Sequence, residues 1–260
     1  PSPSARASSA KTSSWSINVR PQRETDSVFF RLRVLALSPL LLMQGLYVRK
    51  VTPRLPEAAG ARVGEAGTGP ALRLMILGDS AAAGVGTDEQ QHALSGQLAE
   101  RLAGDYRLSW QLWAENGRTT GQSVALLERH PPERFDTVLI SLGVNDVTGG
   151  LALSKWLRHQ HRLVELLLGK FSARHVIFTP LPPMHHFPAL PQPLRWALGM
   201  RAKQFNQALR GFVAEQPHCS LLAFDLPMQA EFIASDGFHP SAMTYALWAE
   251  QAAAAIRRKA

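Results

Sequence analysis

A serine, a histidine and an aspartate in this sequence have the types and spacing needed for acyl transfer. Ser80 follows the apolar run 72–77 and precedes small residues that let another group approach closely. His239 is a candidate base, and Asp236 lies three residues before it. That spacing can bring a carboxylate to Nδ1 of the imidazole and leave Nε2 free to take the serine proton. The pattern predicts a serine nucleophile activated by an oriented base.

Acyl transfer also needs hydrogen-bond donors aimed at the oxyanion that develops on the substrate. The candidate donors are the backbone N–H groups of Ser80 and Gly117 and the side-chain amide of Asn145. An alternative interpretation of the serine segment is a turn without a chemical role, in which Asp79 and Ser80 bond only the local backbone and cap the next helix.

The elements that would position these residues alternate along the chain. Strands are expected at 72–77, 106–113, 136–142, 174–179 and 220–224. Helices are expected at 88–103, 121–129, 151–168, 194–215 and 241–257. This alternation predicts a five-stranded parallel sheet with helices on both faces and right-handed crossovers. The loops that carry Ser80, Gly117 and Asn145 each follow a strand, so they should converge at one edge of the sheet.

Four short motifs, in order, resemble those of the SGNH hydrolases, also called the GDSL esterase/lipase family. They are Gly78-Asp79-Ser80, Gly117 in Asn-Gly-Arg-Thr-Thr, Gly143-Val-Asn145-Asp146 and Asp236-Gly-Phe-His239-Pro240, within a match from about Leu72 to Ile256. The resemblance implies a flavodoxin-like three-layer α/β/α sandwich. It also implies a catalytic triad and an oxyanion hole, formed by Ser80, Asp236 and His239 and by Ser80, Gly117 and Asn145, respectively.

The function expected from the residues and the resemblance is that of a serine ester hydrolase. It would form an acyl-enzyme on Ser80 and use no cofactor and no metal. Lipid or other acyl esters are the expected substrates, and the alternatives within this chemistry are a carbohydrate O-acetylesterase and an acyltransferase. A catalytically silent binding module is the alternative from another class, but such a module does not need the whole set of five residues. The oligomeric state is not predicted.

The positive charge of the chain is concentrated at its N-terminal end. The formal net charge is +8, of which residues 1–54 carry +7 and the remainder only +1. A domain so close to neutral lacks the electrostatic footprint of a protein that binds phosphate backbones. The sequence therefore predicts no nucleic-acid partner.

The sequence predicts four segments, with boundaries at 1–33 for a disordered basic tail, 34–48 for an apolar segment, 49–71 for a linker and 72–260 for the hydrolase domain. The apolar segment is short of the roughly 20 residues that span a bilayer, and Pro39 lies within it. It can be an export signal, a marginal single-span anchor or an interfacial segment. A buried core helix is the alternative, and the basic residues on both sides favour membrane attachment. They give no orientation, so export and attachment at the cytoplasmic face both stay open.

A proline-rich loop, 181–193, leaves the same sheet edge as the candidate site. Its Met184, Phe187 and Leu190, with Trp196 beyond it, would wall an apolar acyl pocket. The alternative is a stiff connection that packs on the domain.

The remaining titratable residues are assigned no chemistry. Asp79 and Asp146 are expected to fix turns, and the single cysteine, Cys219, to be a small buried hydrophobe. The four histidines of the long helix and the proline-rich loop are expected to pack or to face solvent, and no metal site is predicted. They are His159, His161, His185 and His186.

Overall fold

The structure is a computed structural model that describes residues 20–223 and 229–259, without the side chains of residues 20–28 and 31. The chain forms two compact units that divide between Met43 and Gln44. Most of the expected tail, 1–33, lies outside the described residues. The larger unit contains the sheet and all the candidate site residues.

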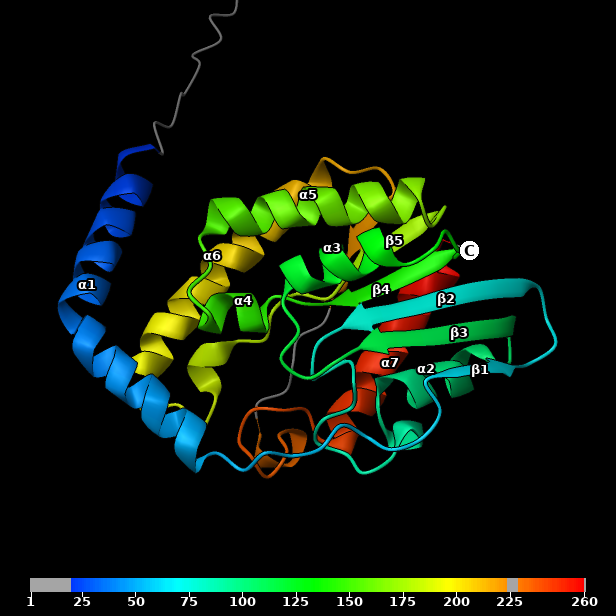
Figure 1. The fold of residues 1–260 in the computed structure, drawn as a ribbon, viewed down its shortest axis with the longest axis horizontal. Helices are drawn as coiled ribbons and strands as arrows, with labels where there is room; N and C mark the ends of the chain where they lie inside the picture. The colour runs from blue at the N-terminus through cyan, green and yellow to red at the C-terminus, as the bar shows by residue number, and fades with distance from the viewer. Residues whose placement is uncertain (1–19, 224–228, 260) are drawn as a thin grey trace, which may run out of the picture. The chain divides into compact units, whose positions relative to one another are not determined.

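The sheet of the larger unit has six strands in the order β1-β3-β2-β4-β5-β6 (Figure 1). Their bounds are Val63–Ala66 for β1, Ala71–Gly78 for β2, Arg107–Ala114 for β3, Thr137–Ser141 for β4, His175–Phe178 for β5 and Cys219–Leu221 for β6. All neighbouring strands are parallel except β1, which is antiparallel to β3. The expected parallel α/β class is therefore confirmed.

The expected number of five strands was wrong, because β1 lies within the segment 49–71 that was assigned to a linker. β1 has only four residues, Val-Gly-Glu-Ala, and it pairs with a neighbour on one side only. Its residues are exposed or half-buried, so the sequence carries no continuous apolar run there. A short edge strand of this kind leaves almost no hydrophobic pattern.

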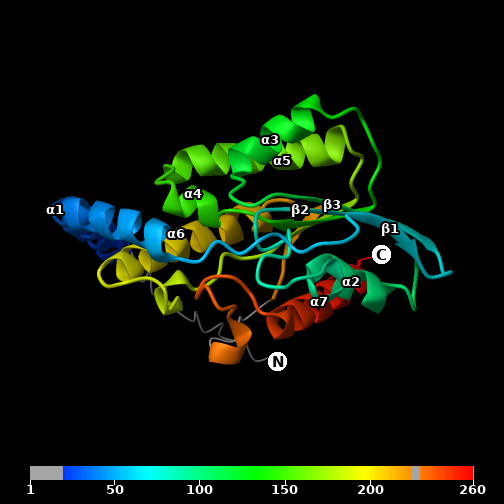
Figure 2. The ribbon, with the colours of Figure 1, turned by 60° about the horizontal axis from the view of Figure 1, so that its bottom comes forward.

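Helices cover both faces of the sheet, which gives the three layers that the family resemblance implied. α3 and α5 lie over one face and α2 and α7 over the other (Figure 2). α6 packs against α5 through Trp156 and Phe205, whose ring centroids are 4.6 Å apart. The helix bounds are Leu94–Leu102 for α2, Thr120–Arg129 for α3, Val144–Thr148 for α4, Leu153–Gly169 for α5, Leu194–Ala214 for α6 and Ala242–Arg257 for α7.

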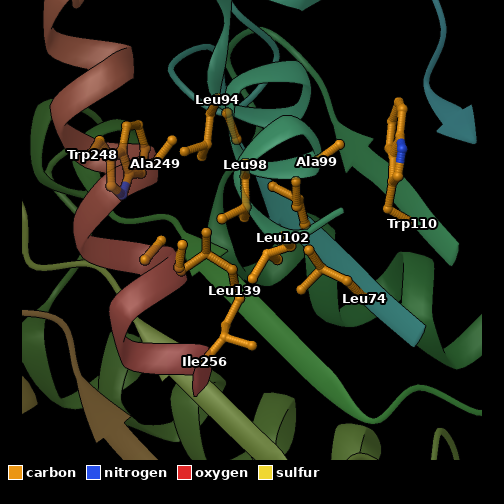
Figure 3. Packing of buried hydrophobic residues seen from close by; sticks show 14 of the residues in the cluster. Leu74, Leu94, Leu98, Ala99, Leu102, Trp110, Leu139, Trp248, Ala249 and Ile256 are labelled. Carbon is orange, nitrogen blue, oxygen red and sulfur yellow. The ribbon is translucent and has the colours of Figure 1, made fainter. Parts of the chain in front are cut away.

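The core between the sheet and the α2–α7 layer follows from helical spacing of apolar residues. Leu94, Leu98 and Leu102 lie on one face of α2 and are fully buried. They meet Trp248 and Ile256 of α7 above the central strands (Figure 3). Each buried leucine contributes about 1.5–3 kcal/mol, and the cluster includes Leu74 and Ile76 of β2, so this layer stabilises the position of the strand.

The N-terminal helix α1 runs from Arg20 to Val51, beyond the apolar segment 34–48 on both sides. It begins inside the segment expected to be a tail and contains Pro39. The proline removes one backbone hydrogen bond without ending the helix. Within α1, residues 32–51 form a 20-residue stretch that is long and apolar enough to cross a membrane.

The segment after β2 packs directly against the first turn of α7 and the residues that precede this helix. The hydroxyl of Tyr245, which is fully buried, donates to the carbonyl of Val85 at 2.7 Å. Gly86 has a φ of +108°, and a Cβ at this position would lie 2.2 Å from the carbonyl oxygen of Pro240. Glycine is therefore required both for the backbone conformation and for the close approach of the two segments.

We expect Gly86→Ala to lower the free energy of unfolding by about 2–4 kcal/mol, because the new methyl group must push the Pro240 segment away. Gly104→Ala is the matched control. No φ in the left-handed region and no atom within 4 Å oppose a Cβ at Gly104. Urea unfolding of both variants measures the difference, and equal stabilities would contradict the role given to Gly86.

Candidate active site

The serine, histidine and aspartate singled out in the sequence form one hydrogen-bonded chain. Ser80 Oγ lies 2.9 Å from His239 Nε2, and His239 Nδ1 lies 2.5 Å from Asp236 Oδ2. Asp236 is buried, whereas the His239 side chain keeps 23% of its exposure. The histidine can therefore take a proton from the serine, because its other nitrogen is held by a carboxylate.

Asp236 is held in its ionised form by the groups around it. Burial by itself would raise the pKa of Asp236, but hydrogen bonds from the His239 side chain and from two backbone N–H groups outweigh it and lower the pKa. The N–H groups of Phe238 and His239 donate to Oδ1 at 2.9 and 3.0 Å. A carboxylate fixed by three donors can orient the imidazole and stabilise its charged form.

Ser80 lies in a tight turn directly after β2. Its carbonyl accepts from the N–H of Val85 at 3.0 Å. Asp79 accepts from the N–H of Ala81 through Oδ1 at 3.2 Å and donates its own N–H to Ser141 of β4. Asp79 therefore fixes the turn, as expected, and Ser80 is left half-buried with its hydroxyl towards His239.

The carboxyl of Asp79 is buried, and this burial raises its pKa to about 7. The N–H of Ala81 and the positive charge of His239 act in the opposite direction but are weaker. Desolvation disfavours the charged form of a carboxyl group, so Asp79 keeps its proton up to a higher pH than an ordinary aspartate does.

The candidate oxyanion donors lie around the same edge of the sheet. The amide Nδ2 of Asn145, in α4, donates to the carbonyl of Arg118 at 3.1 Å, which orients the amide and leaves a second N–H on the same nitrogen. Gly117 has a φ of +81° in the turn after β3. Ser80 and Asn145 line one cavity, whereas Gly117 lines a second, more polar depression, and Asn116 lines both.

A network behind Asn145 ties its helix to α3. Asp146 Oδ2 accepts from the N–H and the hydroxyl of Thr120 at 3.0 and 2.7 Å. The indole N–H of Trp156 donates to the same hydroxyl at 3.2 Å. Asp146 thus fixes the start of α3, as expected of a turn-fixing carboxylate, and burial raises its pKa despite these bonds.

An apolar cavity of about 250 Å³ opens beside Ser80, Asn145 and His239. Met184, Phe187 and Leu190 of the proline-rich loop line it, as predicted, and are nearly fully buried. Trp196 is not among the lining residues, because it lies beyond the loop in the first turn of α6. The large apolar residues that complete the wall are Leu142, Val144, Leu181, Phe238 and Trp248.

The four histidines of α5 and the proline-rich loop lie against neighbouring residues. The ring centroids of His161 and Phe212 are 4.7 Å apart, His159 lies against Gly121, and His185 lies against Gly199 and the ring of His186. Over residues 20–223 and 229–259, no group of three histidine, cysteine or carboxylate side chains is arranged to hold a metal ion.

Two residues that hold the cavity wall were missed in the sequence. Asn206 of α6 and Gln44 of α1 both bind the backbone of the proline-rich loop through their side-chain amides. Neither residue belongs to a motif, and each contact joins positions far apart in the chain. Only the run of prolines, which lack N–H donors, indicated that this loop needs side chains to hold it.

Comparison with protein families gives a match to the GDSL-like lipase/acylhydrolase model over residues 76–247, which is more than half of the chain. The chain belongs to this family and is an esterase or lipase of the GDSL type. A relative, the GDSL-like esterase Rv1075c of Mycobacterium tuberculosis, is 29% identical over 244 residues. The alignment covers 84% of this chain and 76% of that protein.

Solved structures with the same fold include TesA and a lipase from a goat rumen metagenome. TesA is 22% identical with a TM-score of 0.56, over 72% of this chain and 99% of its own. The rumen lipase is 20% identical with a TM-score of 0.56, over 71% of this chain and 97% of its own. At these identities the likeness supports the fold, which agrees with the family match.

We expect Asp79→Asn to change the pH dependence of stability. The folded pKa of about 7 lies above the unfolded value of 3.8, so folding loses stability as the pH rises through this window. The variant lacks this loss, and its stability relative to the unmodified protein should rise by up to roughly 4 kcal/mol between pH 4 and pH 8.

Urea unfolding across this pH range measures the difference between Asp79→Asn and the unmodified protein. Asp88→Asn, at an exposed position, is the matched control for the removal of one carboxylate. A stability difference for Asp79→Asn that does not change with pH would contradict the account of this buried carboxyl.

Proposed function

We propose that the protein is a serine ester hydrolase that cleaves carboxylic esters with apolar acyl groups through an acyl-enzyme on Ser80. The hydrogen-bonded chain from Asp236 through His239 to Ser80 carries this proposal. Membership of an esterase and lipase family supports ester cleavage, and the serine mechanism is the chemistry that this chain of residues can perform.

In the first half of the reaction, Ser80 Oγ attacks the ester carbonyl while its proton moves to Nε2 of His239. The carbonyl oxygen becomes an oxyanion that accepts from the N–H groups of Ser80 and Gly117 and from the amide of Asn145. His239 then gives its proton to the departing alkoxide, the C–O bond breaks, and an alcohol leaves. The acyl group stays on Ser80.

In the second half, water replaces the alcohol. His239 takes a proton from the water, the hydroxide adds to the acyl carbon, and the serine leaves with the proton returned by the imidazole. Asp236 keeps Nδ1 of His239 occupied throughout, so that Nε2 always faces the reacting atoms. The products are a carboxylic acid and an alcohol, and no cofactor is needed.

The substrate class follows from the cavity beside the serine. Its wall is formed mainly by aliphatic and aromatic side chains, which favour an apolar acyl chain over an acetylated sugar. We therefore place lipid or other acyl esters first and carbohydrate O-acetyl esters second.

We expect Ser80→Ala and His239→Ala to lower kcat/KM for p-nitrophenyl butyrate by at least about 10⁴-fold. Asn145→Ala should lower it about 10²- to 10³-fold, because one oxyanion donor is lost. Steady-state kinetics of the full chain measures these effects, and Ser154→Ala, at an exposed position on α5, is the matched control. Comparable activity of Ser80→Ala and Ser154→Ala would refute the assignment of the nucleophile.

We also propose that α1 attaches the protein to a membrane. The apolar stretch 32–51 reaches 20 residues, and only 6% of it is buried in the structure. Arg49 and Lys50 lie in the last turn of α1, and their positive charges favour the anionic surface of a bilayer. An enzyme held at a lipid surface meets the acyl esters that the cavity favours.

We expect the full chain to float with phosphatidylcholine–phosphatidylglycerol vesicles in a density gradient. The double variant Leu35→Asp, Leu42→Asp should stay at the bottom, because two aspartates in the apolar stretch lower partitioning by at least about 10³-fold. Val63→Asp changes an equally exposed apolar residue outside the helix and should still float. This role of α1 would be excluded if all three proteins float equally well, or if the unmodified chain does not float.

A further inference from the structure

The proline-rich loop that walls the cavity has few N–H groups for backbone hydrogen bonds. Residues 179–193 connect β5 to α6, and six of these residues are prolines without an N–H donor. The backbone bonds that remain form a short 3-10 helix at Met184–His186. Side chains supply further support: Arg195 donates to the carbonyls of Leu190 and Pro188 at 2.6 and 3.4 Å, and two side-chain amides bind the backbone, one near each end of the loop.

Asn206 holds the start of the loop. Its Oδ1 accepts from the N–H of Leu181 and its Nδ2 donates to the carbonyl of Leu181, both at 2.8 Å. Leu181 lines the cavity and lies against Gly143, where a Cβ would meet its side chain at 3.1 Å. A carboxamide that bonds both backbone groups of one residue fixes the orientation of that residue.

Gln44 holds the end of the loop in the same way. Its Nε2 donates to the carbonyl of Gln192 at 2.7 Å, and its Oε1 accepts from the N–H of Leu194 at 3.1 Å. Leu194 is the first residue of α6, so this N–H has no acceptor within its own helix. Gln44 belongs to the larger unit, and one turn further along α1 the side chain of Val48 is buried.

The loop residues between the contacts of Asn206 and Gln44 reach the cavity and the loop that carries His239. Phe187 and Leu190 line the cavity, and the Phe187 ring meets the Phe238 ring edge-on with centroids 5.8 Å apart. Phe238 directly precedes His239 in the chain. A displacement of the end of the loop therefore changes the width of the cavity before it reaches the catalytic histidine.

We infer that Gln44 is a positioning residue for the acyl site, so that the final turns of the N-terminal helix set which acyl chains the enzyme accepts. The inference rests on the proposed ester hydrolysis and goes beyond it. The apolar helix, on this view, is not only an attachment to a membrane. It also supports the wall against which the acyl chain of the substrate lies.

The test compares kcat/KM for p-nitrophenyl acetate and p-nitrophenyl octanoate in the full chain, in detergent micelles. Gln44→Met keeps the length of the side chain and removes both hydrogen bonds. It should lower kcat/KM for the octanoate ester about tenfold and leave the acetate value within about twofold. Only the longer chain reaches the wall of the cavity. Gln207→Met, at an exposed position on α6, is the matched control and should behave like the unmodified protein.

Gln44→Glu and the affinity for octanoate test the same role of Gln44 independently. Gln44→Glu keeps the acceptor for Leu194 and loses the donor to Gln192, so it should also lose activity on the octanoate ester first. Calorimetry with octanoate, the acyl product, needs no catalysis, and its affinity should fall in Gln44→Met but not in Gln207→Met.

The outcomes separate the two levels of the proposal. If the unmodified protein hydrolyses no ester, the proposed function is wrong. The affinity for octanoate then still decides whether Gln44 positions the acyl site. The inference is overturned if the Gln44→Met protein folds and both quantities are unchanged: the ratio of kcat/KM for the octanoate ester to that for the acetate ester, and the affinity for octanoate. Equal loss on both esters, or failure of both Gln44 variants to fold, also overturns it, because the residue would then serve stability alone.

Discussion

The hydrogen bond between Ser80 and His239 joins residues 159 positions apart in the chain, and the fold must hold them at 2.9 Å. The serine side is rigid, because it follows β2, which pairs with β3 and β4 along both edges. The histidine side belongs to no strand of the sheet. It is fixed by a bridge between Ile233 and Pro240 and by the close passage of Gly86 beneath it. Regular structure thus positions one partner, and close packing positions the other.

The pKa values of two buried carboxyl groups near this bond shift in opposite directions, because different numbers of hydrogen-bond donors reach them. Asp236 accepts three hydrogen bonds, and its pKa is lowered. The Asp79 carboxyl accepts one backbone bond in a more buried place, and its pKa is raised to about 7. The first carboxylate stays charged beside the histidine, whereas the second keeps its proton up to about pH 7. Below that pH, a neutral Asp79 fixes the serine turn without placing a second negative charge near the reacting atoms.

Local patterns made much of the fold and site predictable from the sequence. Continuous apolar runs predicted β2 and β4, and the short spacing from Asp236 to His239 predicted a contact within a single turn. β1 escaped prediction because it is short and half-exposed. α1 is longer than the apolar segment 34–48 because its first turns are polar and charged and carry no hydrophobic run. Gln44 and Asn206 could not be found, since one amide bonding a distant backbone leaves no periodic signal. Trp196 does not line the cavity, because α6 begins at Leu194 and carries this side chain away from the wall.

Activation of Ser80 by His239 can be measured by intact-mass analysis of the full chain after treatment with a fluorophosphonate, followed by peptide mapping. We expect one adduct per chain, located on the peptide that contains Ser80, and much slower labelling when Asp236 is replaced by alanine. A folded protein that forms no adduct, or one whose adduct lies on another residue, would contradict an activated serine at this position.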